Sequence, residues 1–158
     1  MTSSKDEVSV MAEATQQVIL VPVDFESASL KAIEKAKELA ARTGAEVVLM
    51  HVYQLPVYTY PGLEPTLMPG FHTEVSVAAA RALEQLAAQS GGLRSVLREG
   101  DPASEILATA EEVKPTLIVM GTHGRKGMAH MFLGSVAEKV IRKADAPVLT
   151  VRTPESNP

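Results

Sequence analysis

Short apolar runs alternate with longer segments of helical period along most of this chain. The first run, "QVILVPV" (residues 17–23), is apolar at nearly every position, which is typical of a strand covered on both faces. The segment "SASLKAIEKAKELAARTG" (27–44) has helical spacing, and a second apolar run, "AEVVLMHVY" (45–53), follows it. Strands that alternate with helices form parallel sheets whose crossover helices cover both faces. We therefore expect an α/β fold with an open parallel sheet.

The same alternation predicts five strands and four helices. In the first helix, Leu30, Ile33, Ala36 and Ala40 are expected on the buried face, and Gly44 at the left-handed C-terminal position. The third helix is expected to begin with Asp101 as N-cap and Pro102 in its first turn. The remaining segments are strands at 93–99, 116–120 and 147–151, and helices in 73–92, 101–115 and 134–144.

Size, charge and composition restrict the class of protein. We expect a single domain over residues 17–152, a flexible polar N-terminal tail (1–16) and a C-terminal tail (153–158). A net charge of −4 gives no reason to expect nucleic acid as a partner. There is no cysteine, and no apolar run approaches the ~20 residues that cross a bilayer. These features favour a cytoplasmic protein without membrane insertion.

One connection is long for an α/β unit. Residues 54–72, "QLPVYTYPGLEPTLMPGFH", contain four prolines and several aromatic residues. Such a segment is typical of a lid over a ligand, of a dimer contact, or of a surface loop that packs on itself. The sequence leaves these alternatives open.

The glycines after the fourth strand are the strongest candidate site. Gly121, Gly124 and Gly127 allow positive φ and close backbone approach, and Gly134 with Ser135 opens the last helix. In parallel sheets, ligands bind beyond the carboxyl ends of strands, where helix N-termini present free N–H groups to anions. The segment therefore suits phosphate, although glycines also end strands and serines also cap helices without a ligand.

Other site chemistries are disfavoured. The chain has neither GxxxxGK[ST] nor a GxGxxG after its first strand, so a lysine-bearing P-loop and a dinucleotide site are not expected. No two of His51, His72, His123 and His130 have the i, i+3 or i, i+4 spacing of ligands on a predicted helix. We interpret them as ordinary loop or core residues. Ser135 has no evident base that would make it a nucleophile.

The spacing G-x2-G-x9-G-[ST], formed by Gly121, Gly124, Gly134 and Ser135, resembles the nucleotide-binding motif of the universal stress protein family. The resemblance extends through "VPVDFESAS", "HVY", "REGDPASEIL", "LIVMGTHGRKG", "LGSVAEKVI" and "APVLTV", and so covers about residues 17–152. It implies a Rossmann-like sheet of order 3-2-1-4-5 and ATP bound between strands one and four.

The family's site residues can be carried over to matching positions. By this resemblance, Asp24 lies near the ribose and contacts Mg²⁺ indirectly through Mg-ATP, although a turn or N-cap role is the alternative. Val52 offers backbone hydrogen bonds to adenine, and Met120 flanks the nucleoside. Arg125 and Lys126 neutralise outer phosphates or remain a solvated pair. The wall of the site is Pro22 and Val23, and the ribose and phosphates are surrounded by Gly121, Gly124, Gly134, Ser135 and Val136.

The resemblance implies an ATP-binding regulator of the stress response, read by a protein partner that the sequence does not identify. The alternatives are a slow Mg²⁺-dependent ATPase or nucleotidyl-transfer enzyme with the same pocket, and a structural dimer without ligand. The apolar edge strand at 147–151 predicts a homodimer, alone or within a higher oligomer, and the family's mode of dimerisation implies the same.

Overall fold

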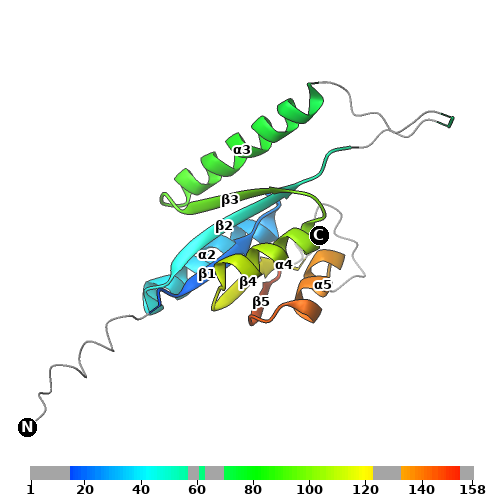
Figure 1. Cartoon of the computed structure of the whole chain (residues 1–158). Coiled ribbons are helices and arrows are strands. Elements are labelled where there is room, and N and C mark those ends of the chain that lie inside the picture. The colour runs from blue at the N-terminus through cyan, green and yellow to red at the C-terminus, as the bar shows by residue number, and fades with distance from the viewer. Residues whose placement is uncertain (1–14, 57–60, 63–69, 123–132, 154–158) are drawn as a thin grey trace, which may run out of the picture.

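A computed structural model of the 158-residue chain describes residues 15–56, 61–62, 70–122 and 133–153. Within them, five parallel strands form one sheet of order β3-β2-β1-β4-β5, as expected (Figure 1). The strands are β1 (Val18–Pro22), β2 (Glu46–Tyr53), β3 (Arg94–Glu99), β4 (Leu117–Gly121) and β5 (Val148–Val151), and the helices are α2 (Ser27–Thr43), α3 (Phe71–Gln89), α4 (Pro102–Val113) and α5 (Ser135–Lys143).

Helices cover both faces of the sheet, which explains the continuous apolar strands. Helix α2 packs on β1, β4 and β5, and α3 packs on β2 and β3. The opposite face carries α4, over β1 and β2, and α5, beside β5. Alternate residues of β1 therefore enter two different cores: Ile19 and Val21 pack under α2, and Leu20 packs under α4 and α5.

Helix α2 begins and ends where the sequence predicts, but its buried face is rotated. Gly44 occupies the left-handed position after its last turn, with φ of 73°, and donates its N–H to the Ala40 carbonyl. Leu30 was expected in the core and is instead 40% exposed. The residues turned toward the sheet are mostly small, which brings the helix close to the strands: Ala28, Ser29, Ala32, Ile33 and Ala36.

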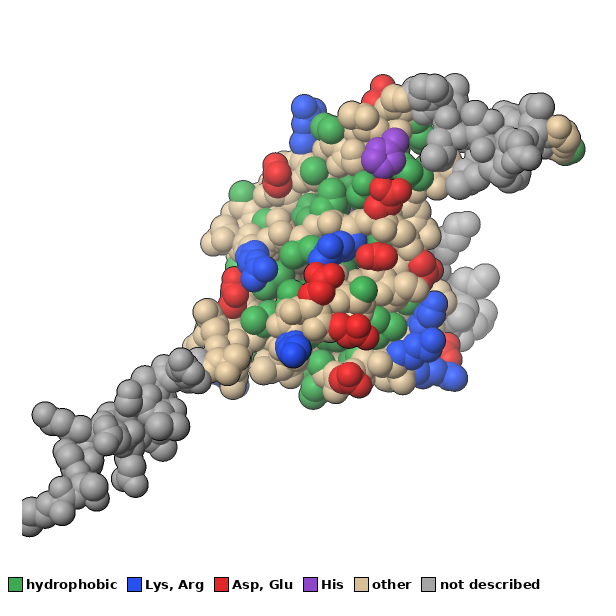
Figure 2. Space-filling view, in the orientation of Figure 1, with side chains coloured by type: hydrophobic (Ala, Val, Ile, Leu, Met, Phe, Trp, Pro, Cys, Tyr) green, Lys and Arg blue, Asp and Glu red, His purple; other side chains and the backbone are tan. Residues whose placement is uncertain are grey.

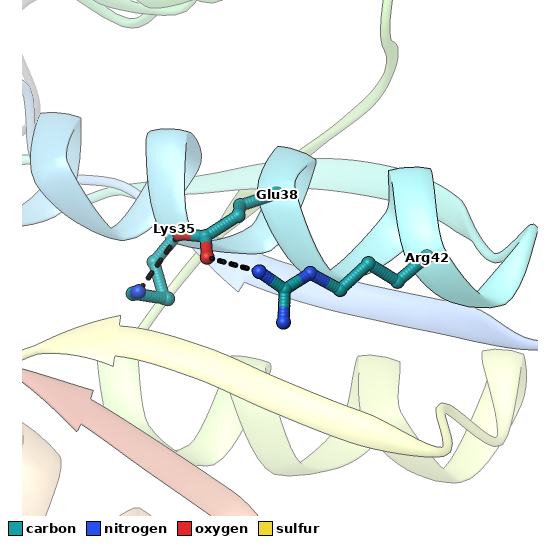
Figure 3. Close-up of polar contacts among 3 residues, drawn as sticks. All are labelled: Lys35, Glu38 and Arg42. Carbon is teal, nitrogen blue, oxygen red and sulfur yellow. Dashed lines mark hydrogen bonds and ion pairs between the residues drawn. The ribbon is translucent and has the colours of Figure 1, made fainter.

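The outer side of α2 carries charged residues. Glu38 accepts hydrogen bonds from Lys35 at 2.8 Å and from Arg42 at 3.3 Å (Figure 3). The hydrogen bond from Lys35 is the main reason that the pKa of Glu38 lies below its ordinary value. These side chains are solvent-exposed, so the network adds little to stability.

The strand predicted at 93–99 is confirmed as the edge strand β3. Arg94 and Glu99 at its ends are exposed and the residues between them half-buried, which explains its weak apolar signal.

Figure 2 shows acidic and basic side chains interspersed over the described residues of one face. None of the helices in the described ranges is long and apolar enough to span a bilayer. Most of the two predicted tails, and most of the long connection after β2, lie outside the described residues.

Candidate functional site

A cleft of about 370 Å³ opens at the carboxyl ends of β1, β2 and β4. It lies at the point where the chain leaves β1 toward α2 on one face and leaves β4 toward α5 on the other, which is where α/β sheets bind ligands. The cleft brings together these residues singled out from the sequence: Pro22, Val23, Asp24, Val52, Met120, Gly121, Gly134, Ser135 and Val136. Gly124, Arg125 and Lys126 lie outside the described residues.

Asp24 is held in a turn between β1 and α2. Its Oδ1 accepts the Glu26 N–H at 3.0 Å, and its own N–H donates to Ser29 Oγ at 3.3 Å. Ser29 Oγ in turn donates to the Glu26 carbonyl at 3.0 Å. Glu26, not Asp24, is the N-cap residue of α2. Asp24 therefore has the turn role that was expected as the alternative to a ligand role, and this turn fixes one of its carboxylate oxygens. Asp24 also lines the cleft.

The N-terminus of α5 faces the same cleft. Its N-cap residue is Gly134, with φ of −70° and ψ of 158°, which has no side chain to cap the first turn. The Gly134 N–H is not available to a ligand, because it donates to the Thr122 carbonyl at 2.6 Å. The amides that follow it, from Ser135 onward, carry the positive end of the helix dipole.

Gly121 lines the cleft and also has a packing role. Its φ is not among the positive values of the described residues, so it does not use the positive φ that a glycine allows. The close backbone approach that a glycine allows is present, and the neighbour is helix α2. A Cβ on Gly121 would stand 2.8 Å from the Ala28 Cβ and 3.0 Å from the Ser29 nitrogen. Gly121 therefore lets α2 pack against the end of β4.

Several lining residues were not predicted from the sequence. Ser29 and Thr122 add hydroxyl groups, Pro102 and Ile106 of α4 add an apolar wall, and His51 lies beside Val52. The α4 residues belong to another crossover, so no local pattern placed them here. His51 donates from Nδ1 to the Val23 carbonyl at 2.7 Å. Its position directly before Val52 was the one available signal.

Two polar clusters lie beyond the carboxyl ends of β2 and β3. Asp101 caps α4 through the Ser104 N–H, and the hydrogen bonds from the Ser104 hydroxyl and amide keep the pKa of Asp101 below its ordinary value. Glu99 accepts from Tyr53 at 3.1 Å and pairs with His72 at 2.9 Å. The hydrogen bond from His72 is the first cause of the lowered pKa of Glu99, and desolvation is the first cause of the raised pKa of Tyr53. These bonds tie the start of α3 to the ends of β2 and β3.

A second cavity, of about 690 Å³, lies at the opposite end of the strands, near the amino ends of β4 and β5. Its lining includes Lys114 and Lys143 at the C-terminal ends of α4 and α5, together with Glu111 and Asp145. Helix C-termini direct carbonyl groups outward and disfavour anions. We therefore regard the smaller cleft as the better candidate for a phosphate-bearing ligand.

Known proteins resemble this chain over nearly its whole length. Universal stress protein MJ0531 of Methanocaldococcus jannaschii is 35% identical over 140 residues, covering 87% of this chain and 82% of that protein. The solved structure of hypothetical protein MJ0577, from the same organism, matches with a TM-score of 0.73 at 27% identity, covering 89% of this chain and 98% of that one.

A universal stress protein solved in complex with cAMP matches with a TM-score of 0.59 at 25% identity, covering 85% of this chain and 96% of that one. The model of the Universal stress protein family matches residues 16–152. With this match, and with the sheet order and cleft described above, the chain belongs to the universal stress protein family.

Proposed function

We propose that this protein binds ATP in the cleft between β1 and β4 and acts as a nucleotide-dependent regulator. The observation that carries the proposal is the convergence of the N-terminus of α5, whose N-cap residue is a glycine, and the Asp24 carboxylate on one partly apolar cleft. Helix amides suit phosphate oxygens, a carboxylate suits ribose hydroxyls or a hydrated cation, and the apolar wall suits a base. The relative solved with cAMP supports an adenine nucleotide as the ligand class.

The residues present fit each part of the ligand. Met120 and Val52 flank the space for the nucleoside, and Ser135 and Val136 begin the helix that faces the phosphates. Asp24 keeps Oδ2 without a partner among the described residues. One carboxylate together with triphosphate oxygens is a common environment for Mg²⁺, which would neutralise phosphate charge when bound. Gly124, Arg125 and Lys126 are proposed as further phosphate contacts on the strength of the motif alone.

The proposed role is binding rather than turnover. Catalysis of hydrolysis needs a base aimed at the attacking water, and none of the four residues of the G-x2-G-x9-G-[ST] motif is one. We propose that a protein partner in the stress response binds the nucleotide-bound state selectively. We also propose that the protein works in the cytoplasm as one domain over residues 17–152. Its proposed oligomeric state is a homodimer formed through β5. Steady Mg²⁺-dependent phosphate release, lost in Asp24→Ala, would favour the enzyme alternative.

The test is direct. Native protein is purified without added nucleotide, its bound small molecules are identified by mass spectrometry, and stripped protein is titrated calorimetrically with ATP and, separately, with GTP. We expect an adenine nucleotide to co-purify and ATP to bind more tightly than GTP. A stripped, folded protein that gives no heat with ATP at millimolar concentration, with or without Mg²⁺, would refute the proposal and favour the ligand-free dimer.

A further inference from the structure

We infer that His51 is a positioning residue of the cleft: its ring holds the residues before and after Asp24, and so sets the direction of the Asp24 carboxylate. The consequence for nucleotide affinity rests on the function proposed above. The consequence for the β1–α2 turn does not, because the contacts involved lie within the protein.

Val23 is tied to β2 on both of its backbone groups. Its N–H donates to the Met50 carbonyl at 2.8 Å, and its carbonyl accepts from His51 Nδ1 at 2.7 Å. The pairing of β1 with β2 ends at Pro22 and Met50, so the imidazole extends the link past the end of the ladder. Because a carbonyl oxygen only accepts, Nδ1 must carry the hydrogen, which fixes the tautomer of the neutral ring.

Phe25, on the other side of Asp24, has an unfavourable backbone conformation. Its φ is 66°, in the left-handed region that residues other than glycine rarely occupy. Such a conformation persists only where the surroundings hold it. The Phe25 ring lies against the His51 ring, with centroids 4.6 Å apart and planes inclined by 56°. The same imidazole therefore contacts both neighbours of Asp24.

The turn that orients Asp24 depends on these two contacts. Glu26 can donate its N–H to Asp24 Oδ1 at 3.0 Å only while Phe25 keeps the chain folded back. Without the imidazole, we expect Phe25 to return to negative φ, the Glu26 hydrogen bond to open, and the carboxylate to lose its fixed direction toward the cleft. A carboxylate that must be ordered on binding costs affinity.

The experiment compares His51→Gln with His51→Asn. The Asn side-chain nitrogen can occupy the place of Nδ1, whereas the Gln nitrogen extends toward the place of Nε2, and both variants lose the ring. Amide hydrogen exchange at Glu26 is measured by NMR without nucleotide, and ATP affinity by calorimetry. His72→Gln, at the pair with Glu99, is the matched histidine control. Far-UV circular dichroism and thermal unfolding verify that each variant is folded.

In His51→Gln we expect faster exchange at Glu26 and a Kd for ATP raised about tenfold, the value of one lost hydrogen bond. His51→Asn, which keeps a donor but loses the ring, should raise both the exchange rate at Glu26 and the Kd, each by less than His51→Gln does, and His72→Gln should change neither quantity. A folded His51→Gln with wild-type exchange and wild-type Kd overturns the inference. If His51→Gln does not fold, His51→Phe, which keeps a ring but no donor, is judged by the same criteria. A wild-type protein that does not bind ATP refutes the proposed function alone, and the exchange measurement still decides the role of His51.

Discussion

Gly121 and Ala28 are in such close contact that a Cβ on the glycine would stand 2.8 Å from the Cβ of the alanine. The next atoms, backbone atoms of Ala28 and Ser29, would be at 3.0 Å. This contact fixes how near the start of α2 lies to the end of β4, on the side of the sheet away from α5. Space at Gly121 is therefore a requirement of packing, whether or not a ligand is bound.

We predict that Gly121→Ala lowers the free energy of unfolding by about 1–3 kcal/mol, the usual cost of overpacking a tight contact. Urea unfolding followed by circular dichroism measures it. Ala28→Gly in the same protein should restore only part of the loss, because backbone atoms also meet the new methyl group. Wild-type stability in Gly121→Ala would contradict the packing role.

Gly134→Val tests the proposed phosphate site. The φ of −70° and ψ of 158° at Gly134 suit any residue, so the fold should persist. The branched side chain would enter the space at the N-terminus of α5 and keep phosphate from the amides, and ATP binding should be abolished. Calorimetric titration is the measurement. Unchanged ATP affinity in the folded variant would remove α5 from the site.

Asp101→Asn should change the acid stability of the protein. The hydrogen bonds from Ser104 lower the pKa of Asp101 in the folded state from its ordinary value of 3.8. Its ionised form therefore stabilises the fold above pH 3.8, and this contribution is lost as the pH falls through the lowered pKa. Asn still caps α4 but does not titrate. The stability difference between wild type and variant should shrink on acidification below pH 3.8 in urea unfolding, and a difference independent of pH would contradict this assignment.

Two buried threonines form a matched pair. Thr109 is fully buried in α4, and its Oγ1 has no hydrogen-bond partner in the described part of the chain. Thr122 is also buried, but its Oγ1 donates to the Val151 carbonyl at 3.4 Å. Thr109→Val should leave stability unchanged or raise it by about 1 kcal/mol, whereas Thr122→Val should lower it by a similar amount. Thermal unfolding of both variants decides, and destabilisation by Thr109→Val would indicate an unrecognised partner of that hydroxyl.

The strands could be predicted because burial on both faces produces continuous apolar runs, of which Ile19–Val21 is the clearest. The strand order could not be deduced from local patterns, since these do not say which strands are neighbours; it came from the family resemblance and is confirmed. The prediction for Leu30 was wrong because helical period leaves the orientation of a face uncertain when alanines line it. Because α2 packs close to the sheet, the small residues Ala28 and Ala32 are buried against the strands instead.

The site was only partly predictable for a similar reason. Asp24 and Gly134 stand in motifs, so their place at the cleft could be expected and is observed. The contact that explains Gly121 is with a residue of α2, and the contact that gives His51 a role is with β1. Both depend on the fold and have no local signature. The sequence shows that a glycine or a histidine is present, but only the tertiary structure shows which residue it contacts.

We predict a homodimer through β5. This strand is at the edge of the sheet, and Leu149 is 37% exposed. The carbonyls of Pro147 and Val151 accept from Ile118 and Thr122 of the β4 side. Since backbone groups alternate along a strand, the N–H and C=O of Leu149 also point toward β4, and those of Val148 and Thr150 point away from it, toward the open edge.

Thr150→Pro should therefore remove an outward N–H and separate the dimer while the subunit stays folded, because an edge strand tolerates proline on its open side. Leu149→Pro is the contrasting variant: it removes an inward donor and should destabilise the subunit itself. Sedimentation equilibrium gives the mass, and circular dichroism the fold. A wild-type mass near 16.8 kDa at micromolar concentration, or a Thr150→Pro protein that remains dimeric, would exclude β5 as the dimer interface.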